Sequence, residues 1–258
     1  MTTETLAGDS ESPFDVQVVP MASESIPILG PRLVKRSAKP LPARFVDRPN
    51  RFTARVVLRS GKLVRAHLPN PGRLTGTLVP GCQVLLDGPY PSSYRCRYKL
   101  VAAREGRVWV CTITTYVNSL FPLLLQSGLF PELPPSNLRA EVRRGQSRFD
   151  FALDSCLIEL KSVTLARNGV GMFPDAITER GRRHVLELAR FAQQGQPAAI
   201  IFMAQRGDVT AVTAAADIDP AFAEALRRAR DAGVQLLACA LWFARDGARR
   251  AWRVPVVI

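Results

Sequence analysis

Residues 149–161 decide how the C-terminal half of the chain folds: Phe149-Asp150-Phe151-Ala152-Leu153, then Asp154-Ser155, then Cys156-Leu157-Ile158-Glu159-Leu160-Lys161. Two apolar-rich runs on either side of a two-residue turn predict a β-hairpin. In the register that such a turn sets, Asp150 lies opposite Glu159. Directly opposed side chains hold their Cβ atoms ~4.5–5.5 Å apart, where two like charges are destabilising unless something neutralises them.

A divalent cation is the natural neutraliser of such a pair. Lys161 lies two residues beyond Glu159, so strand periodicity places it on the same face. Mg²⁺ prefers a few carboxylates, retained waters and phosphate oxygens to a cage made only of protein ligands. In this arrangement the lysine orients or helps to deprotonate an attacking water, while the metal stabilises charge on a phosphodiester.

The spacing Asp-x8-Glu-x-Lys is the catalytic signature of the PD-(D/E)xK nucleases, and Glu141, ahead of the hairpin, is a candidate third acid. We therefore predict a nuclease-type centre that uses Mg²⁺ or Mn²⁺. Its predicted catalytic residues are Asp150, Glu159, Lys161 and Glu141, and its predicted metal ligands are Asp150, Glu159 and Glu141. The alternative is a Glu159–Lys161 surface pair on an edge strand, which contributes little to stability.

Helix and strand patterns alternate after the hairpin. A helix is predicted at 178–194, and a second helix begins at Asp219-Pro220 and ends near Gly233. The continuous apolar runs 198–204 and 234–241 predict strands that are buried on both faces. The order strand, helix, strand, helix, strand predicts an α/β layer with a partly parallel sheet.

Three arginines, Arg180, Arg182 and Arg183, lie in the first turns of the 178–194 helix. Cations at a helix N-terminus oppose the helix dipole, an arrangement that is easier to explain if they face phosphate together with the free backbone N–H groups. The alternative is a solvated face on which Glu179 and Glu187 offset their charge.

Two polar residues near this helix leave their roles open. For His184, a surface or packed histidine is the favoured interpretation. Gln205 ends the 198–204 strand, where it either aligns a water or phosphate or merely ends the strand.

The middle of the chain holds most of the charge excess. Residues 41–135 contain 13 basic and 4 acidic residues, a net of +9 out of +13 for the 258-residue chain. Short strands are predicted at 51–58, 63–68, 82–87, 94–102 and 108–114. Five short strands separated by turn residues predict an OB-like β-barrel.

Basic and aromatic side chains alternate on this predicted barrel. Arg55 lies on the outward face of the 51–58 strand. Tyr94, Arg95, Arg97, Tyr98 and Lys99 interleave the two residue types that stack bases and neutralise phosphates. We predict Arg55, Arg95, Arg97, Lys99, Arg180, Arg182 and Arg183 as nucleic-acid contacts. The alternative is a solvated basic face without a ligand, since 30 Arg against only 5 Lys also fits codon bias.

The composition divides the chain and limits its class. We predict a flexible leader at 1–40, a basic OB-like barrel at 41–115, a helix and linker at 116–135, and a PD-(D/E)xK nuclease-like α/β domain at 136–258. The five scattered cysteines form no C-x-x-C pair, which favours a reducing cytoplasm. The sequence has neither an apolar run long enough to span a membrane nor a secretory signal pattern.

Three motifs resemble the sugar fermentation stimulation protein A (SfsA) family from about Arg51 to the C-terminus. The segment 67–76, HLPNPGRLTG, looks like the family's H-C-P-N-T-G-x-M-T-G. Residues 147–151 and 158–165 resemble S-R-I-D-F and E-V-K-S-V-T-L. The segment 171–181, GMFPDAITERG, is close to G-Y-F-P-D-A-V-T-E-R-G. Leu68 and Pro71 depart from the family's Cys and Thr.

The resemblance implies an OB-like domain followed by a restriction-endonuclease-like domain with a mixed sheet. It also implies non-specific DNA binding and a proposed role in regulating sugar (maltose) metabolism. Carried over residue by residue, it assigns Glu141, Asp150, Glu159 and Lys161 to the nuclease-type site. Asn70 and Arg73 lie in the loop that matches the family motif, and we predict them as further nucleic-acid contacts.

Three functions are consistent with the sequence. The first is a DNA-binding protein, and the second is a Mg²⁺-dependent nuclease with endonuclease-like phosphodiesterase activity. The third is a catalytically idle module that binds an acidic metabolite or a protein partner. We favour DNA binding with the acidic site retained. The sequence leaves the oligomeric state open.

Overall fold

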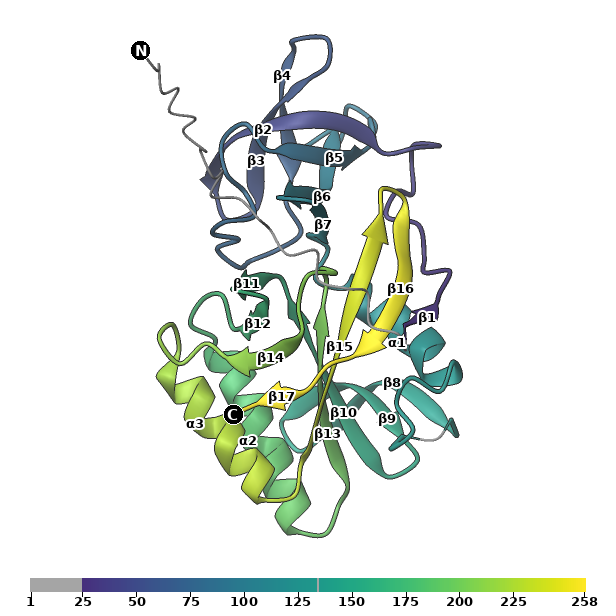
Figure 1. Cartoon of the computed structure of the whole chain (residues 1–258), viewed down its shortest axis with the longest axis vertical. Helices are drawn as coiled ribbons and strands as arrows, with labels where there is room; N and C mark the ends of the chain where they lie inside the picture. Colours follow the sequence, from purple (N-terminus) through teal and green to yellow (C-terminus); the bar gives the residue numbers. More distant parts are fainter. Residues whose placement is uncertain (1–24, 134) are drawn as a thin grey trace, which may run out of the picture.

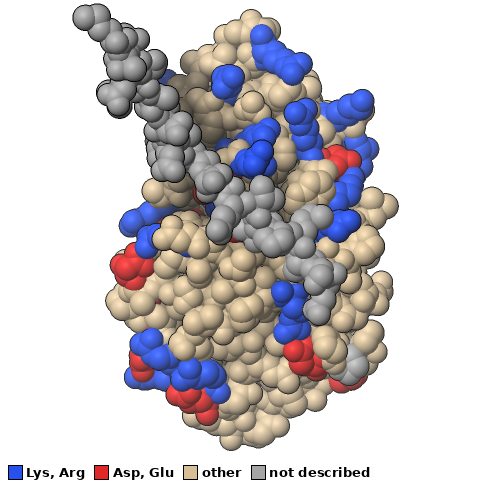
Figure 2. Space-filling model, viewed as in Figure 1, with Lys and Arg blue, Asp and Glu red and all other residues tan. Residues whose placement is uncertain are grey.

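The computed structural model describes residues 25–133 and 135–258. It contains a small barrel above a larger mixed sheet that carries the helices (Figure 1). Lys and Arg side chains are frequent over the barrel, whereas much of the lower domain is uncharged in the same view (Figure 2).

Six strands form the upper domain: β2 (Leu41–Asn50), β3 (Thr53–Leu58), β4 (Leu63–His67), β5 (Gln83–Asp87), β6 (Tyr98–Glu105) and β7 (Val108–Cys111). Their order is β4-β3-β2-β5-β6-β7, and a parallel pairing of β4 with β6 closes the first five into a barrel. Alternate residues such as Ala54 and Val56 point into its core. The predicted OB-like barrel is confirmed.

Two features of the barrel differ from the sequence prediction. β2 was not predicted, because Pro42 and Pro49 lie near its two ends and polar residues interrupt its apolar pattern. The strand predicted from residue 94 begins at Tyr98 instead, so Tyr94 and Arg95 lie in the connection before β6.

A seven-stranded mixed sheet forms the lower domain, in the order β1-β16-β15-β13-β10-β9-β8. Its strands are β1 (Ile26–Pro27), β8 (Leu138–Arg144), β9 (Ser147–Leu153), β10 (Cys156–Val163), β13 (Ala198–Ala204), β15 (Gln235–Ala244) and β16 (Gly247–Arg253). The central strands β10, β13 and β15 are parallel, and the remaining pairings are antiparallel. This confirms the predicted mixed sheet.

Helices cover both faces of this sheet. The first face packs against α1 (Tyr116–Gln126), and the second packs against α2 (Glu179–Gln193) and α3 (Pro220–Asp231). Asp219 caps α3 by accepting a 2.9 Å hydrogen bond from the Phe222 N–H. A small sheet that was not predicted lies beside them, formed by β11 (Leu165–Arg167), β12 (Val170–Phe173), β14 (Ala211–Ala214) and β17 (Val256–Val257).

Residues 25–40 form a strap that runs from the lower domain to the barrel. β1 pairs with β16 in the lower sheet, and Leu33 and Val34 are buried in the core around α1. The prediction of a flexible leader through residue 40 is therefore wrong for residues 25–40. This segment is held in place by the pairing of β1 with β16 and by the burial of Leu33 and Val34. Residues 1–24 lie outside the described residues. Leu133, in the predicted Pro-rich linker, is also buried in that core.

Asp87 anchors the strap to the barrel. Its carboxylate accepts hydrogen bonds from the backbone N–H groups of Lys35, Arg36 and Ser37 at 2.9–3.1 Å and from the Tyr90 hydroxyl at 2.5 Å. Burial alone would raise the pKa of Asp87, but these hydrogen bonds outweigh it and lower the pKa below its ordinary value.

Asp87→Asn is expected to lower the free energy of unfolding by roughly 1–3 kcal/mol at about pH 7, because it removes a charged acceptor from several partly buried donors. A lowered folded-state pKa gives stability that is present above the unfolded value of about 3.9 and lost as pH falls through the folded value. The difference from the unsubstituted protein should therefore shrink below about pH 4. Urea unfolding at both pH values measures it, with the exposed Asp231→Asn as the control. Equal unfolding midpoints at about pH 7 would contradict it.

Two neighbouring residues after β13 join the domains. Gln205 donates from Nε2 to the Ile113 carbonyl at 3.0 Å, and its own carbonyl accepts from the Cys111 N–H. The guanidinium of Arg206 donates to both carboxylate oxygens of Glu105 on β6 at 3.0 Å and to Asp208. Gln205 therefore contributes to the contact between the two domains. The sequence had left open whether it aligns a water or phosphate or merely ends the strand.

Candidate functional site

A cleft of about 690 Å³ lies between the barrel and the lower domain. The lower domain contributes residues of β9, β10 and the N-terminal parts of α1 and α2. The barrel contributes Arg51 and the loop of Asn70, Pro71 and Gly72. Asp150, Glu159 and Lys161 all line this cleft, so the predicted convergence of the three side chains on one space is present.

Asp150 lies where the β9–β10 hairpin stops pairing. The observed pairs Cys156–Leu153, Leu157–Ala152 and Ile158–Phe151 have the predicted register. In the same register the next pair is Asp150 and Glu159, but the backbone pairing of the two strands ends before it. Instead, the Asp150 side chain contacts the neighbouring strand, where its Oδ2 accepts from the Leu160 N–H at 2.8 Å. The other oxygen, Oδ1, accepts from Asn118 Nδ2 on α1 at 2.9 Å.

Glu159 forms a buried cluster with Lys161 and His184. The three residues are only 6%, 5% and 4% exposed. Glu159 Oε1 accepts a hydrogen bond from Lys161 Nζ at 2.8 Å and another from His184 Nδ1 at 2.8 Å. An exposed Glu159–Lys161 surface pair is therefore wrong, because β10 is an interior strand and α2 covers it.

The two carboxylates differ in their pKa values. Burial, followed by the charge of Glu159, raises the pKa of Asp150 above its ordinary value. Burial would also raise the pKa of Glu159, but the charge of Lys161 and the hydrogen bonds from His184 and Lys161 outweigh it, so the pKa is lowered. The site thus holds two neighbouring carboxylates with one lysine ammonium beside them.

Glu141 does not join this pair. Its side chain is 70% exposed at the cleft rim and pairs with Arg148 at 3.4 Å. Glu141 also has a left-handed backbone conformation, with φ of 54°, inside β8. Among the residues that the structure describes, no three His, Cys, Asp or Glu side chains form a group that could hold a metal ion. The role of Glu141 as a catalytic residue and third metal ligand stays a prediction, and in this structure its carboxylate lies beside Arg148.

A barrel loop closes one side of the cleft against Asp175. The Asp175 carboxylate accepts from the Leu74 N–H at 3.3 Å, and a Cβ on Gly72 would lie 2.1 Å from Asp175 Oδ2, so any side chain at position 72 would require this carboxylate to shift. Asn70 Oδ1 accepts from the Gly72 N–H at 2.8 Å. Asn70, predicted as a nucleic-acid contact, therefore shapes this loop with its side-chain oxygen.

The other predicted nucleic-acid contacts fall into three places. Arg180 lines the cleft, and Arg182 and Arg183 lie in an open hollow next to it. Arg73 is exposed near the cleft mouth. Arg95 and Lys99 line a separate groove on the barrel.

Two arginines have partners within the protein. Arg55 is paired with Asp47 on β2, which neutralises the charge predicted to face a phosphate. Arg97 is exposed, and its Nε donates to the Tyr90 carbonyl at 3.2 Å.

The roles of His184, Asn118 and Asp175 were not predicted from the sequence. His184 lies four residues before Leu188 on the buried face of α2, a spacing that could have placed it against β10. Asn118 and Asp175 carry no comparable local signal, because their partners lie 32 and 101 residues away in the sequence.

Family models match both domains. The model "SfsA N-terminal OB domain" matches residues 46–112, and "Sugar fermentation stimulation protein RE domain" matches residues 115–247. The chain belongs to the SfsA family. The predicted resemblance is therefore confirmed, together with the OB domain followed by a restriction-endonuclease-like domain. The domain limits predicted at residues 40, 115 and 135 stay a prediction.

Relatives and a solved structure agree with this assignment. The sugar fermentation stimulation protein homologue of Moorella thermoacetica is 38% identical over 213 residues, covering 80% of this chain and 91% of the relative. That of Chloroflexus aurantiacus is 37% identical over 219 residues, covering 83% and 84%. The solved structure of Pyrococcus furiosus SfsA in complex with Ca²⁺ superposes with a TM-score of 0.77 at 27% identity, covering 87% of this chain and 99% of that one. No described helix of this SfsA chain is long and apolar enough to cross a membrane.

Proposed function

We propose that this SfsA-family chain binds DNA without sequence preference across the cleft and the basic barrel, and that its acidic site hydrolyses phosphodiesters with Mg²⁺ or Mn²⁺. The observation that carries the proposal is the placement of Asp150, Glu159 and Lys161 in one cleft that the basic barrel borders. Phosphate contacts position a protein on DNA but carry no base information, which fits binding without sequence preference.

The donor set fits a hard divalent cation. Mg²⁺ is usually held by one or two carboxylates, with waters and substrate phosphates completing its shell. Asp150 and Glu159 supply two, and Glu159 Oε2 accepts no hydrogen bond from the described residues, which leaves it available. The Pyrococcus furiosus protein was solved in complex with Ca²⁺, a cation with the same preference for oxygen ligands.

The chain's own residues have distinct tasks in this mechanism. A divalent cation, when bound, would supply positive charge that stabilises the negative charge developing on the phosphodiester. Lys161 keeps Glu159 ionised, and its remaining N–H groups orient a water or a phosphate oxygen. His184 and Asn118 position the two carboxylates.

The setting of this activity is part of the same proposal. The five free cysteines favour a reducing cytoplasm. A regulatory role in sugar (maltose) metabolism follows from the family resemblance alone.

DNA affinity is expected to fall steeply with salt, with log K linear in log salt concentration, because phosphate neutralisation releases counterions. Fluorescence anisotropy with a labelled duplex measures it. The double variant Arg180→Ala/Arg183→Ala should reduce the salt slope by about 2, since each phosphate contact contributes about 1.

The matched control is Arg227→Ala/Arg228→Ala, which removes two exposed arginines from α3 and should leave the slope unchanged. An affinity that barely changes between low and moderate salt would contradict the proposal. Absence of any DNA binding would favour an idle module that takes an acidic metabolite or a protein partner.

A further inference from the structure

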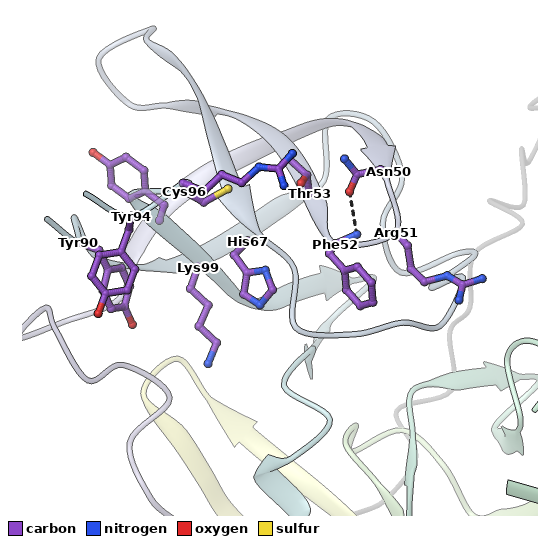
Figure 3. Close-up of a pocket in the computed structure, with 11 residues that line it drawn as sticks. Asn50, Arg51, Phe52, Thr53, His67, Tyr90, Tyr94, Cys96 and Lys99 are labelled. Atoms are coloured by element: carbon purple, nitrogen blue, oxygen red, sulfur yellow. Dashed lines mark hydrogen bonds between the residues drawn. The ribbon is translucent and has the colours of Figure 1, made fainter. Parts of the chain in front are cut away.

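A second hollow of about 640 Å³ lies on the barrel, and we call it the barrel groove. Phe52, at the β2–β3 turn, and Tyr94, in the connection before β6, lie towards its two ends, with His67 and Lys99 between them (Figure 3). Its volume is within the roughly 300–1,000 Å³ of ligand pockets. The proposed cleavage site uses none of these four residues.

Two aromatic rings in the barrel groove are exposed to solvent. Phe52 is 50% exposed and Tyr94 is 57% exposed. Tyr94 packs on Tyr90 with ring centroids 5.4 Å apart, and the Tyr90 hydroxyl is held by Asp87. Because Asp87 also binds the strap, the support beneath Tyr94 is fixed before any ligand arrives.

The rim of the barrel groove is basic. Arg51, Arg95 and Lys99 line it, and the set of lining residues includes no Asp or Glu. None of these three side chains forms an ion pair with a described residue, in contrast to Arg55 on the same barrel. A ligand with flat apolar faces and repeated negative charges matches this combination.

Arg51 connects the barrel groove to the cleft. Arg51 lines both hollows, and the cleft is the one that holds Asp150 and Lys161. The barrel groove and the cleft therefore adjoin at Arg51.

We propose that the barrel groove holds unpaired nucleotides of a single-stranded nucleic acid, stacked on Phe52 and Tyr94, and that the strand continues past Arg51 into the cleft. This inference rests on the proposed nucleic-acid binding and names the form of substrate. In a duplex each base is already stacked and paired, so it offers no free face to an aromatic ring. The groove thus selects single strands and duplexes with single-stranded tails over blunt duplexes.

The test compares affinities of the full chain for oligothymidylate and for a blunt duplex of equal length. Fluorescence anisotropy is recorded in EDTA, so that cleavage does not contribute, and at one salt concentration, so that both DNA forms are compared under the same ionic conditions. The double variant Phe52→Ala/Tyr94→Ala should lower the affinity for oligothymidylate by roughly tenfold or more. Its affinity for the blunt duplex should change less than about twofold, since paired bases do not reach the rings.

Two further variants separate stacking from general damage to the barrel. Leu63→Ala removes a similarly exposed apolar side chain from β4, which does not line the groove, and should leave both affinities unchanged. Phe52→Tyr/Tyr94→Phe keeps both rings and should bind oligothymidylate like the unsubstituted protein.

The outcomes distinguish this inference from the proposed function. Equal affinity for the two DNA forms, with no effect of Phe52→Ala/Tyr94→Ala, would overturn the groove assignment while DNA binding stands. Failure to bind either form would overturn the proposed function itself. Competition by free thymidine monophosphate as effective as competition by oligothymidylate would also overturn the inference, because it would indicate a small-molecule pocket.

Discussion

Lys161→Ala is expected to lower Mg²⁺-dependent cleavage of DNA by roughly 10²–10⁴-fold, the usual contribution of a positioned acid–base group. Lys161 and Glu159 both lie on β10, and the lysine ammonium is 2.8 Å from Glu159 Oε1. Without it, the pKa of Glu159 rises towards the value that burial favours, and the site loses the group that orients water or phosphate. A gel assay with end-labelled DNA measures the rate.

Binding and packing must be separated from chemistry in this experiment. Lys161→Met keeps most of the side-chain volume and should lose cleavage to the same extent. Anisotropy in EDTA should show DNA affinity within about twofold of the unsubstituted protein, because the lysine is buried and contributes little to phosphate contacts at the surface. Cleavage that survives both substitutions would indicate a contaminating nuclease or a different catalytic group.

Arg206→Met is expected to lower the free energy of unfolding by about 3–5 kcal/mol, the range for breaking a buried ion pair from one side. Arg206 is almost fully buried and donates to Glu105 of the barrel, to Asp208 and to the Thr164 carbonyl. Removing it leaves the partly buried carboxylates of Glu105 and Asp208 without their cation.

Urea unfolding followed by circular dichroism measures this effect. The matched control is Arg167→Met, which breaks an ion pair with Asp217 in which both side chains are about half exposed, and which should change stability little. If Arg206→Met unfolds at the same urea concentration as the control, the Glu105 contact does not hold the domains together.

The sequence allowed prediction of the elements whose signals are local. The β9–β10 hairpin was predicted in its correct register because the turn and both strands lie within 17 consecutive residues. α2 followed from its 3.6-residue apolar period, and β13 from its uninterrupted apolar run. The small sheet could not be predicted, because its strands are two to four residues long and β14 pairs with residues distant in the sequence.

The candidate site divides in the same way. Asp150, Glu159 and Lys161 could be assigned together because one hairpin carries all three. Asn118 and His184 come from two helices on opposite faces of the sheet, and only the packed structure brings them to the carboxylates. Local spacing also could not show that Arg55 is neutralised by Asp47, since the partner is eight residues away across a turn that was not predicted.

The strap has a mechanical consequence for the cleft. The chain passes between the two domains twice, once through residues 25–40 and once between β7 and α1. Together with the Arg206–Glu105 pairing and the Leu74–Asp175 hydrogen bond, these two crossings restrain the barrel against the lower domain at several points, so the spacing between the barrel groove and the acidic site is expected to stay nearly constant. A strand lying from the barrel groove to the acidic site would then meet the carboxylates along one reproducible approach.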